Sequence, residues 1–150
     1  MHFQTADFFR KSSLQLLNTL TKEQLCYIPK GFNNHILWNI GHLLITEQML
    51  TYGLSNLELS VDSKFKTLYG KGSQPKSTVT NEEIEAIKTY LIPAIKNTER
   101  DLKKGIFKTY NEYTTSPKIT LHNVEEALNF NILHEGIHFG IILSIKKTLK

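Results

Sequence analysis

The sequence predicts an all-α protein built as a four-helix bundle. Apolar residues recur at three- and four-residue steps in four long stretches, the spacing of one helix face, and no stretch shows a convincing strand pattern. Long connections separate the later stretches. Four amphipathic helices bury their apolar faces by packing against one another, which favours a bundle. The pattern alone leaves the order and direction of the helices open.

The composition is typical of one globular domain, residues 1–150. A chain of 150 residues and 17.3 kDa buries a sizeable core without disulfides. Its 40% hydrophobic and 21% charged residues exclude a disordered or collagen-like chain. The single cysteine, Cys26, has no internal partner and is expected to be a small buried apolar residue. We therefore expect a reducing, cytoplasmic location, with neither a secretory signal nor a transmembrane helix.

The first helix is predicted over about Phe3–Leu20. Its face is formed by Ala6, Phe9, Ser13, Leu16, Leu17 and Leu20. Pro29 and Gly31 follow in a connector over residues 21–32, so any helix there is short.

The second helix is predicted to begin after Asn33 or Asn34, both good N-caps, and to end at Gly53. Helical steps of three and four then define a buried stripe of His35, Trp38, His42, Ile45, Met49 and Tyr52.

The segment 54–78 is expected to be an exposed loop with a short helical turn near Val61–Leu68. Within it, Gly70-Lys71-Gly72-Ser73 superficially resembles a phosphate-binding loop. It lacks the upstream glycine of that motif, and no strand precedes it, so we do not assign phosphate binding to it.

The third helix has a capping box, Thr80 with Glu83 three residues later, and runs towards Lys104, with Gly105 as its stop. Pro93 lies inside it and should kink it.

We expect no regular structure over residues 106–119, and a fourth helix that begins after Thr120 and continues nearly to the end. Its predicted stripe is Val124, Ala127, Asn131, His134, His138, Ile141 and Ile145.

The six histidines are the richest source of candidate chemistry: His2, His35, His42, His122, His134 and His138. His134 and His138 are four residues apart, so both stand on the helix face that should point into the bundle. Two imidazoles in a core need partners, and a metal ion would satisfy one nitrogen of each ring. The alternative is a pair of partly exposed residues at a groove.

His42 is the other histidine in the middle of a predicted core face. Three neutral imidazoles that converge leave a fourth position for water or substrate, which is the arrangement of catalytic zinc. A lone core histidine is more often a hydrogen-bonded packing residue. His35 lies about 10 Å along the helix from His42 and is expected near the rim of any pocket. His122 is expected to be solvated.

Two carboxylates near these histidines carry no assigned role. His134 to His138 match the H-E-x-x-H pattern of zinc proteases, but no His, Asp or Glu follows His138 as a third ligand. We therefore do not favour a protease, and expect Glu135 to be a solvated or interhelical carboxylate. Glu47 is expected at a solvated helix position rather than as a support for His42.

Two motifs together resemble the DinB-like (YfiT-like) family. The segment Leu37-Trp38-Asn39-Ile40-Gly41-His42-Leu43, after a Pro/Gly connector over residues 29–33, resembles its first motif. The segment from His134 to Ile142, with His-x-x-x-His followed by Gly-x-Ile, resembles its second. Order and spacing agree, and the resemblance covers essentially the whole chain.

The resemblance implies a four-helix bundle of up-down-down-up order with a divalent metal ion, zinc or nickel, held by His42, His134 and His138. It implies a metal-dependent enzyme that acts on a small molecule, by transfer of a low-molecular-weight thiol to an electrophile or by hydrolysis. No catalytic side chain is assigned. Many relatives carry a further histidine where this chain has Ile137.

The alternative function is a non-catalytic metal- or small-ligand-binding module of a stress response. A net charge of +4 is weak support for nucleic-acid binding, because the lysines are scattered. We expect a small-molecule substrate, no nucleic acid, no membrane, and a homodimer, for which Phe8, Tyr90 and Phe130 offer a second apolar face.

Overall fold

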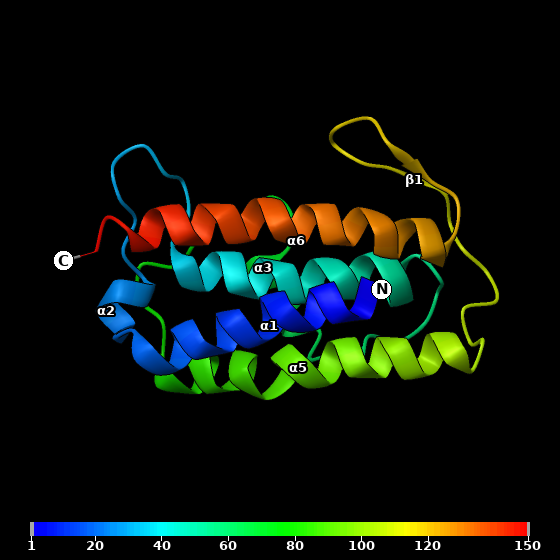
Figure 1. The fold of residues 1–150 in the computed structure, drawn as a ribbon, viewed down its shortest axis with the longest axis horizontal. Coiled ribbons are helices and arrows are strands. Elements are labelled where there is room, and N and C mark those ends of the chain that lie inside the picture. Colours follow the sequence, from blue (N-terminus) through cyan, green and yellow to red (C-terminus); the bar gives the residue numbers. More distant parts are fainter. Residues whose placement is uncertain (1, 150) are drawn as a thin grey trace.

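Helices dominate the computed structural model, which describes residues 2–149 (Figure 1). The all-α class predicted from the sequence is confirmed. The long helices of the described residues are α1 (His2–Thr19), α3 (Ile36–Gln48), α5 (Asn81–Lys103) and α6 (Val124–Lys146). The short elements are α2 (Lys22–Leu25), the π-helix η1 (Met49–Gly53), α4 (Lys64–Tyr69), β1 (Tyr113–Thr114) and β2 (Thr120–Leu121).

The capping box predicted for α5 is present. The Thr80 hydroxyl accepts from the Glu83 amide, and the Glu83 carboxylate accepts from the Thr80 amide, so two amide donors at the helix start are paired. At the other end, Gly105 has a φ of +64°, the left-handed conformation in which helices commonly stop. Pro93 lies within the helix, as the sequence indicates.

The start and end of α3 differ from prediction. Neither Asn33 nor Asn34 caps it, because Nδ1 of His35 accepts from the Trp38 amide at 2.9 Å and makes His35 the N-cap. The helix then continues as the π-helix η1, whose C-cap is Leu54 rather than Gly53. His35 is 1% exposed, so its predicted place at a pocket rim is wrong.

The α3 helix lies at the centre of the molecule and is buried on nearly every side rather than along one stripe. Of its residues only Thr46 is not buried. Helices α4, α5 and α6 all pack against α3, while α1 packs against α5 and α6. A helix that is apolar all round is one that neighbours surround. This central position brings α3 face to face with α6.

The predicted stripe of α6 is buried in part: Val124, Ala127, Asn131 and Ile145 are buried, as predicted. Leu128, Glu135 and Ile142 are buried as well, whereas His134 and His138 are half-buried and line a pocket. The reason is that α1 and α3 both pack against α6 and divide its surface between them.

The connector before α6 also contains structure that the sequence did not predict. Strands β1 and β2 form a small antiparallel pair, Tyr113 opposite Leu121 and Thr114 opposite Thr120. The helix itself begins later than predicted, because Asn123 caps it by accepting from the Glu126 amide. Strands of two residues are too short to leave a periodic pattern in a sequence.

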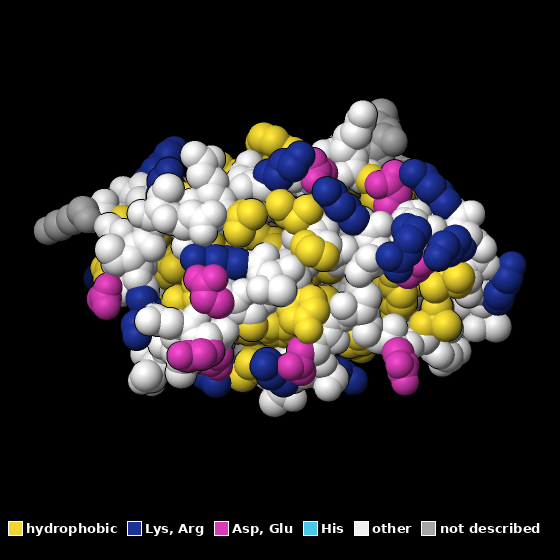
Figure 2. All heavy atoms as spheres, turned by 90° about the horizontal axis from the view of Figure 1, so that it is seen from below, with side chains coloured by type: hydrophobic (Ala, Val, Ile, Leu, Met, Phe, Trp, Pro, Cys, Tyr) yellow, Lys and Arg dark blue, Asp and Glu magenta, His cyan; other side chains and the backbone are white. Residues whose placement is uncertain are grey.

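Among the described residues, no helix has the length and apolarity needed to cross a membrane. The α5 side of the molecule, seen from below in Figure 2, shows lysine and arginine side chains interspersed with acidic and hydrophobic ones.

Candidate metal centre

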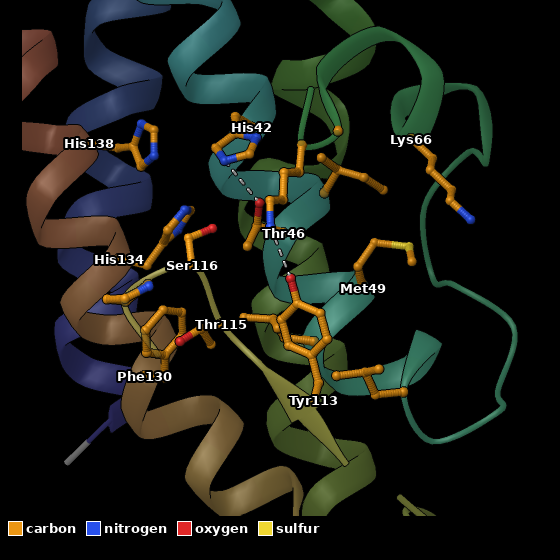
Figure 3. Close-up of a pocket in the computed structure, with 16 residues that line it drawn as sticks. His42, Thr46, Met49, Lys66, Tyr113, Thr115, Ser116, Phe130, His134 and His138 are labelled. Carbon is orange, nitrogen blue, oxygen red and sulfur yellow. Dashed lines mark hydrogen bonds between the residues drawn. The ribbon is translucent and has the colours of Figure 1, made fainter. Parts of the chain in front are cut away.

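Three histidines from two helices converge at one point. His42 comes from α3, and His134 and His138 come from α6 (Figure 3). One nitrogen of each ring lies within 4.8 Å of a nitrogen of each of the other two. The ring centroids are 4.5–5.1 Å apart. The structure thus brings together the three residues that the sequence singled out.

Two of the rings have their tautomer set by a neighbouring acceptor. Nδ1 of His42 donates to the Tyr69 carbonyl at 2.7 Å. Nδ1 of His138 lies 2.8 Å from Oδ1 of Asn39. The Asn39 amide nitrogen donates to the His35 carbonyl at 2.9 Å, so its oxygen must be the atom that faces His138. Both rings therefore carry their proton on Nδ1 and keep Nε2 as an acceptor.

The third ring has an unpaired nitrogen. Nδ1 of His134 is buried and has no hydrogen-bond partner among the described residues. A buried polar atom without a partner costs free energy, so this ring suits a site where binding of a cation gives it one.

All three imidazoles are neutral near pH 7. Burial, together with the charges of His138, His42 and Arg10, lowers the pKa of His134 to about 3. Burial, with the neighbouring His42, lowers the pKa of His138 to about 4. Burial also lowers the pKa of His42, against the hydrogen bond to Tyr69. Neutral imidazole is the form that ligates metal ions, so the donor set fits a divalent cation.

A loop holds the centre from the side of α3. The indole of Trp38 stacks on the His42 ring at a centroid distance of 4.6 Å, and its Nε1 donates to the Ser73 hydroxyl at 3.0 Å. Tyr69, four residues before Ser73, accepts from His42. Gly41 permits this approach, because a Cβ there would lie 2.5 Å from the Tyr69 ring.

A pocket of about 520 Å³ opens at the three histidines (Figure 3). This volume is in the range of small-molecule sites. Its apolar wall is formed by Ile45, Met49, Leu50, Leu54, Pro117 and Phe130. Its polar groups, besides the histidines, are Thr46, Lys66, Lys71, Tyr113, Thr115 and Ser116. The Thr46 hydroxyl lies 3.3 Å from Nε2 of His42.

Glu135 faces away from the pocket into the core. Its Oε1 accepts from Nη2 of Arg10 on α1 at 2.5 Å and from the Asn131 amide at 2.9 Å. Arg10 also donates to the Leu43 carbonyl on α3 at 3.1 Å. Of the two predicted alternatives, the interhelical carboxylate is confirmed. This pair ties α1, α3 and α6 together directly behind His134.

The predicted solvated position of Glu47 is wrong. The residue is 0% exposed and accepts from the Thr98 hydroxyl at 2.6 Å and from the Gln48 amide at 2.8 Å. Burial raises the pKa of its carboxyl, against the opposing charge of Arg10. Helix α5 covers this side of α3, and periodicity on α3 alone gave no sign of that cover.

The remaining candidates lie apart from the centre. His122 is exposed, as predicted, and its Nδ1 is 2.9 Å from a Glu112 carboxylate oxygen. Cys26 is half-buried against the core, and burial raises the pKa of its thiol. A raised pKa disfavours the thiolate, so Cys26 is poorly suited to act as a nucleophile.

Sequence reasoning missed two groups that position the centre. Asn39 stands one helical turn before His42, so a polar side chain on the same face was a readable signal. The Tyr69 contact is made by a backbone carbonyl, and no side-chain pattern identifies such a group.

The family model described as the DinB superfamily matches residues 6–142. This span includes all three histidines and both motifs noted in the sequence. No curated protein matches the chain.

Proposed function

The chain belongs to the DinB superfamily, and we propose that it is a metal-dependent enzyme acting on a small molecule. The proposed ligands of a zinc or nickel ion are His42, His134 and His138. One observation carries the proposal: three neutral imidazoles converge at a pocket large enough for a substrate. A divalent ion bound there would supply Lewis acidity, which lowers the pKa of a thiol or water beside it.

We propose thiol transfer rather than hydrolysis as the reaction. In such a transfer the sulfur of a low-molecular-weight thiol forms a bond to carbon, the leaving group departs with the electron pair of the broken bond, and the thiol proton goes to solvent. No aspartate or glutamate of the described chain lines the pocket, so an attacking water would lack a carboxylate base. The apolar wall would pack against the carbon portion of an electrophile.

Chain residues would orient the reactants. Nδ1 hydrogen bonds to Tyr69 and Asn39 hold two rings in one tautomer, and the stacked Trp38 fixes the plane of His42. Thr46 offers a hydroxyl beside Nε2 of His42. A cytoplasmic location, where small thiols are kept reduced, is part of the proposal.

We also propose the up-down-down-up helix order of the family. The long crossover between α3 and α5, residues 54–80, supports it, because parallel neighbours need such a connection. The colour gradients along the helices in Figure 1 agree with this order.

We also propose a homodimer, and Phe8 is the member of the predicted surface that is exposed. Phe130 lines the pocket, and Tyr90 is half-buried with its ring 5.7 Å from Phe65, so neither is free for a partner. Phe8 and Ile137 are 58% and 56% exposed. Sedimentation at micromolar concentration checks the dimer. We propose no nucleic-acid or membrane partner, in keeping with the mixed charges in Figure 2.

The test combines metal analysis with turnover. Untagged protein, His138→Ala and the control His122→Ala, which removes an exposed histidine outside the pocket, are assayed for bound metal and for transfer of cysteine to an alkyl halide. Loss of metal and turnover in His138→Ala alone supports the proposal. Bound metal without turnover for any small thiol favours the binding module instead. Full activity in metal-free His138→Ala overturns the proposal.

A further inference from the structure

The segment Gly70–Ser73, set aside as a phosphate loop, forms a tight turn at the pocket. The Ser73 amide donates to the Gly70 carbonyl at 3.0 Å, and Gly72 has a φ of +86°. This is the pattern of a type II turn, in which the third residue needs a positive φ and is usually glycine. Lys71 is the second residue of the turn.

The turn is fastened on both sides to α3. The carbonyl of Tyr69, the residue before the turn, accepts from His42, and the hydroxyl of Ser73, the last residue of the turn, accepts from Trp38. Trp38 and His42 are one helical turn apart and stack on each other. Lys71 therefore lies in a short turn, and both ends of this turn are hydrogen-bonded to the part of α3 that carries His42.

The Lys71 side chain lines the pocket and extends to Tyr113. Its Nζ lies 3.5 Å from the Tyr113 hydroxyl, a contact drawn as the dashed line on Tyr113 in Figure 3. Lys66 lines the same pocket. Within residues 2–149, neither lysine is within ion-pair distance of a carboxylate, whereas the nearby Lys64 and Lys76 each have one.

The charge of the pocket is uncompensated. Its lining contains two lysines and, among the described residues, no aspartate or glutamate. With three neutral imidazoles, the charged side chains of the lining are Lys66 and Lys71, both positive, and a bound divalent ion would add to that charge. In Figure 3 the Lys66 side chain points away from the three histidines, so Lys71, beside Tyr113, supplies the charge that faces the pocket. A concave site of one sign concentrates ligands of the other.

We propose that the pocket takes an anionic substrate, a small carboxylate-bearing molecule with an apolar portion, and that Lys71 binds the carboxylate. The apolar portion packs on the wall formed by Met49, Leu50 and Phe130. This deepens the proposed function and rests on it for the identity of the site as a reaction centre.

The experiment uses hexanoate as the probe, with hexanamide and hexylamine as matched uncharged and cationic compounds. Isotope-labelled protein is titrated with each and followed by NMR, once metal-free and once loaded with zinc. We expect hexanoate to bind about fivefold more tightly than hexanamide, as for a solvent-accessible charged contact. The shifts should concentrate on residues 69–73 and Tyr113.

Variants identify the group responsible. Lys71→Met should abolish the preference for hexanoate, and Lys71→Arg should retain it. Lys146→Met removes the same charge from the exposed end of α6 and should leave the preference unchanged. Equal binding of hexanoate and hexanamide, or a preference that persists in Lys71→Met, overturns the inference.

The two proposals fail differently. If the protein binds no metal but prefers hexanoate through Lys71, the substrate class stands and the metal-dependent reaction falls. If metal binds and thiol is transferred without any carboxylate preference, the reaction stands and the substrate class falls.

Discussion

Asn39 on α3 accepts a hydrogen bond from His138 on α6, with Oδ1 and Nδ1 2.8 Å apart. Because the Asn39 amide nitrogen is committed to the His35 carbonyl, the contact can form in one orientation only. It fixes which nitrogen His138 offers to the pocket.

Replacing the Asn39 side chain should weaken metal binding without unfolding the protein. In Asn39→Leu, His138 loses the acceptor for its Nδ1 proton, so zinc affinity should fall about 10- to 100-fold, as for other partners of metal ligands. Chelator competition measures the change. Asn39→Asp retains the acceptor oxygen and should recover much of the affinity. Unchanged affinity in Asn39→Leu would show that the contact does not orient the ligand.

The histidines should contribute little to the fold compared with their neighbour Trp38. His138→Ala should keep its helical circular dichroism and lose its metal. Trp38→Ala removes a large buried side chain and should lose about 3–5 kcal/mol of unfolding free energy. Urea denaturation of both metal-free variants makes the comparison. Global unfolding of His138→Ala would instead make the centre structural.

Gly41 is a steric requirement of the centre. In Gly41→Ala the new Cβ would fall 2.5 Å from Cγ of Tyr69, an atom near the base of a buried ring. The displacement should cost about 1–3 kcal/mol and weaken the contact of Tyr69 with His42. Gly140→Ala on α6 meets nothing within 4 Å and should be neutral or stabilising. Thermal melts that rank the two variants the other way would contradict this.

The buried Arg10–Glu135 pair should show strong coupling. Arg10→Met leaves the Glu135 charge unpaired in the core and should cost about 3–5 kcal/mol. Adding Glu135→Leu should restore most of that loss, because both charges are then gone. Lys11→Met, which breaks the exposed pair with Asp7, should change stability by less than about 1 kcal/mol. If the double variant loses as much stability as the two single variants together, the Arg10 and Glu135 charges are not coupled.

Glu47 should give stability an unusual dependence on pH. Burial raises the pKa of this carboxyl in the folded protein above its usual 4.5, so the folded state holds the proton more tightly than the unfolded chain. The protonated carboxyl therefore adds to the free energy of unfolding below pH 4.5, and this addition declines as the pH rises through the folded pKa. Relative to Glu47→Gln, the wild type should lose up to about 1.4 kcal/mol per pH unit in that window. Urea denaturation from pH 4 to 8 measures the difference, and parallel curves would contradict it.

Periodicity predicted the helices and placed His42, His134 and His138 on inward faces. It could not predict which side of each helix would meet which neighbour. The predicted solvated position of Glu47 was wrong, because its burial depends on Thr98 on another helix. For Glu135 the sequence left a solvated position open, because its buried partner Arg10 also lies on another helix. Lys71 had no helical pattern to place it, and its position follows from a turn and two contacts with α3.

The hydrogen bond between Asn39 and His138 joins residues 99 positions apart. During synthesis, a chain that has not yet reached residue 138 has at most two of the three histidines. His42 is made first, and α4 and α5 are made before the other two. The donor set therefore exists only after α6 has been made and has docked on α3. A cation that requires all three rings can bind only after this docking, and a chain that stops before residue 138 lacks one of the three ligands.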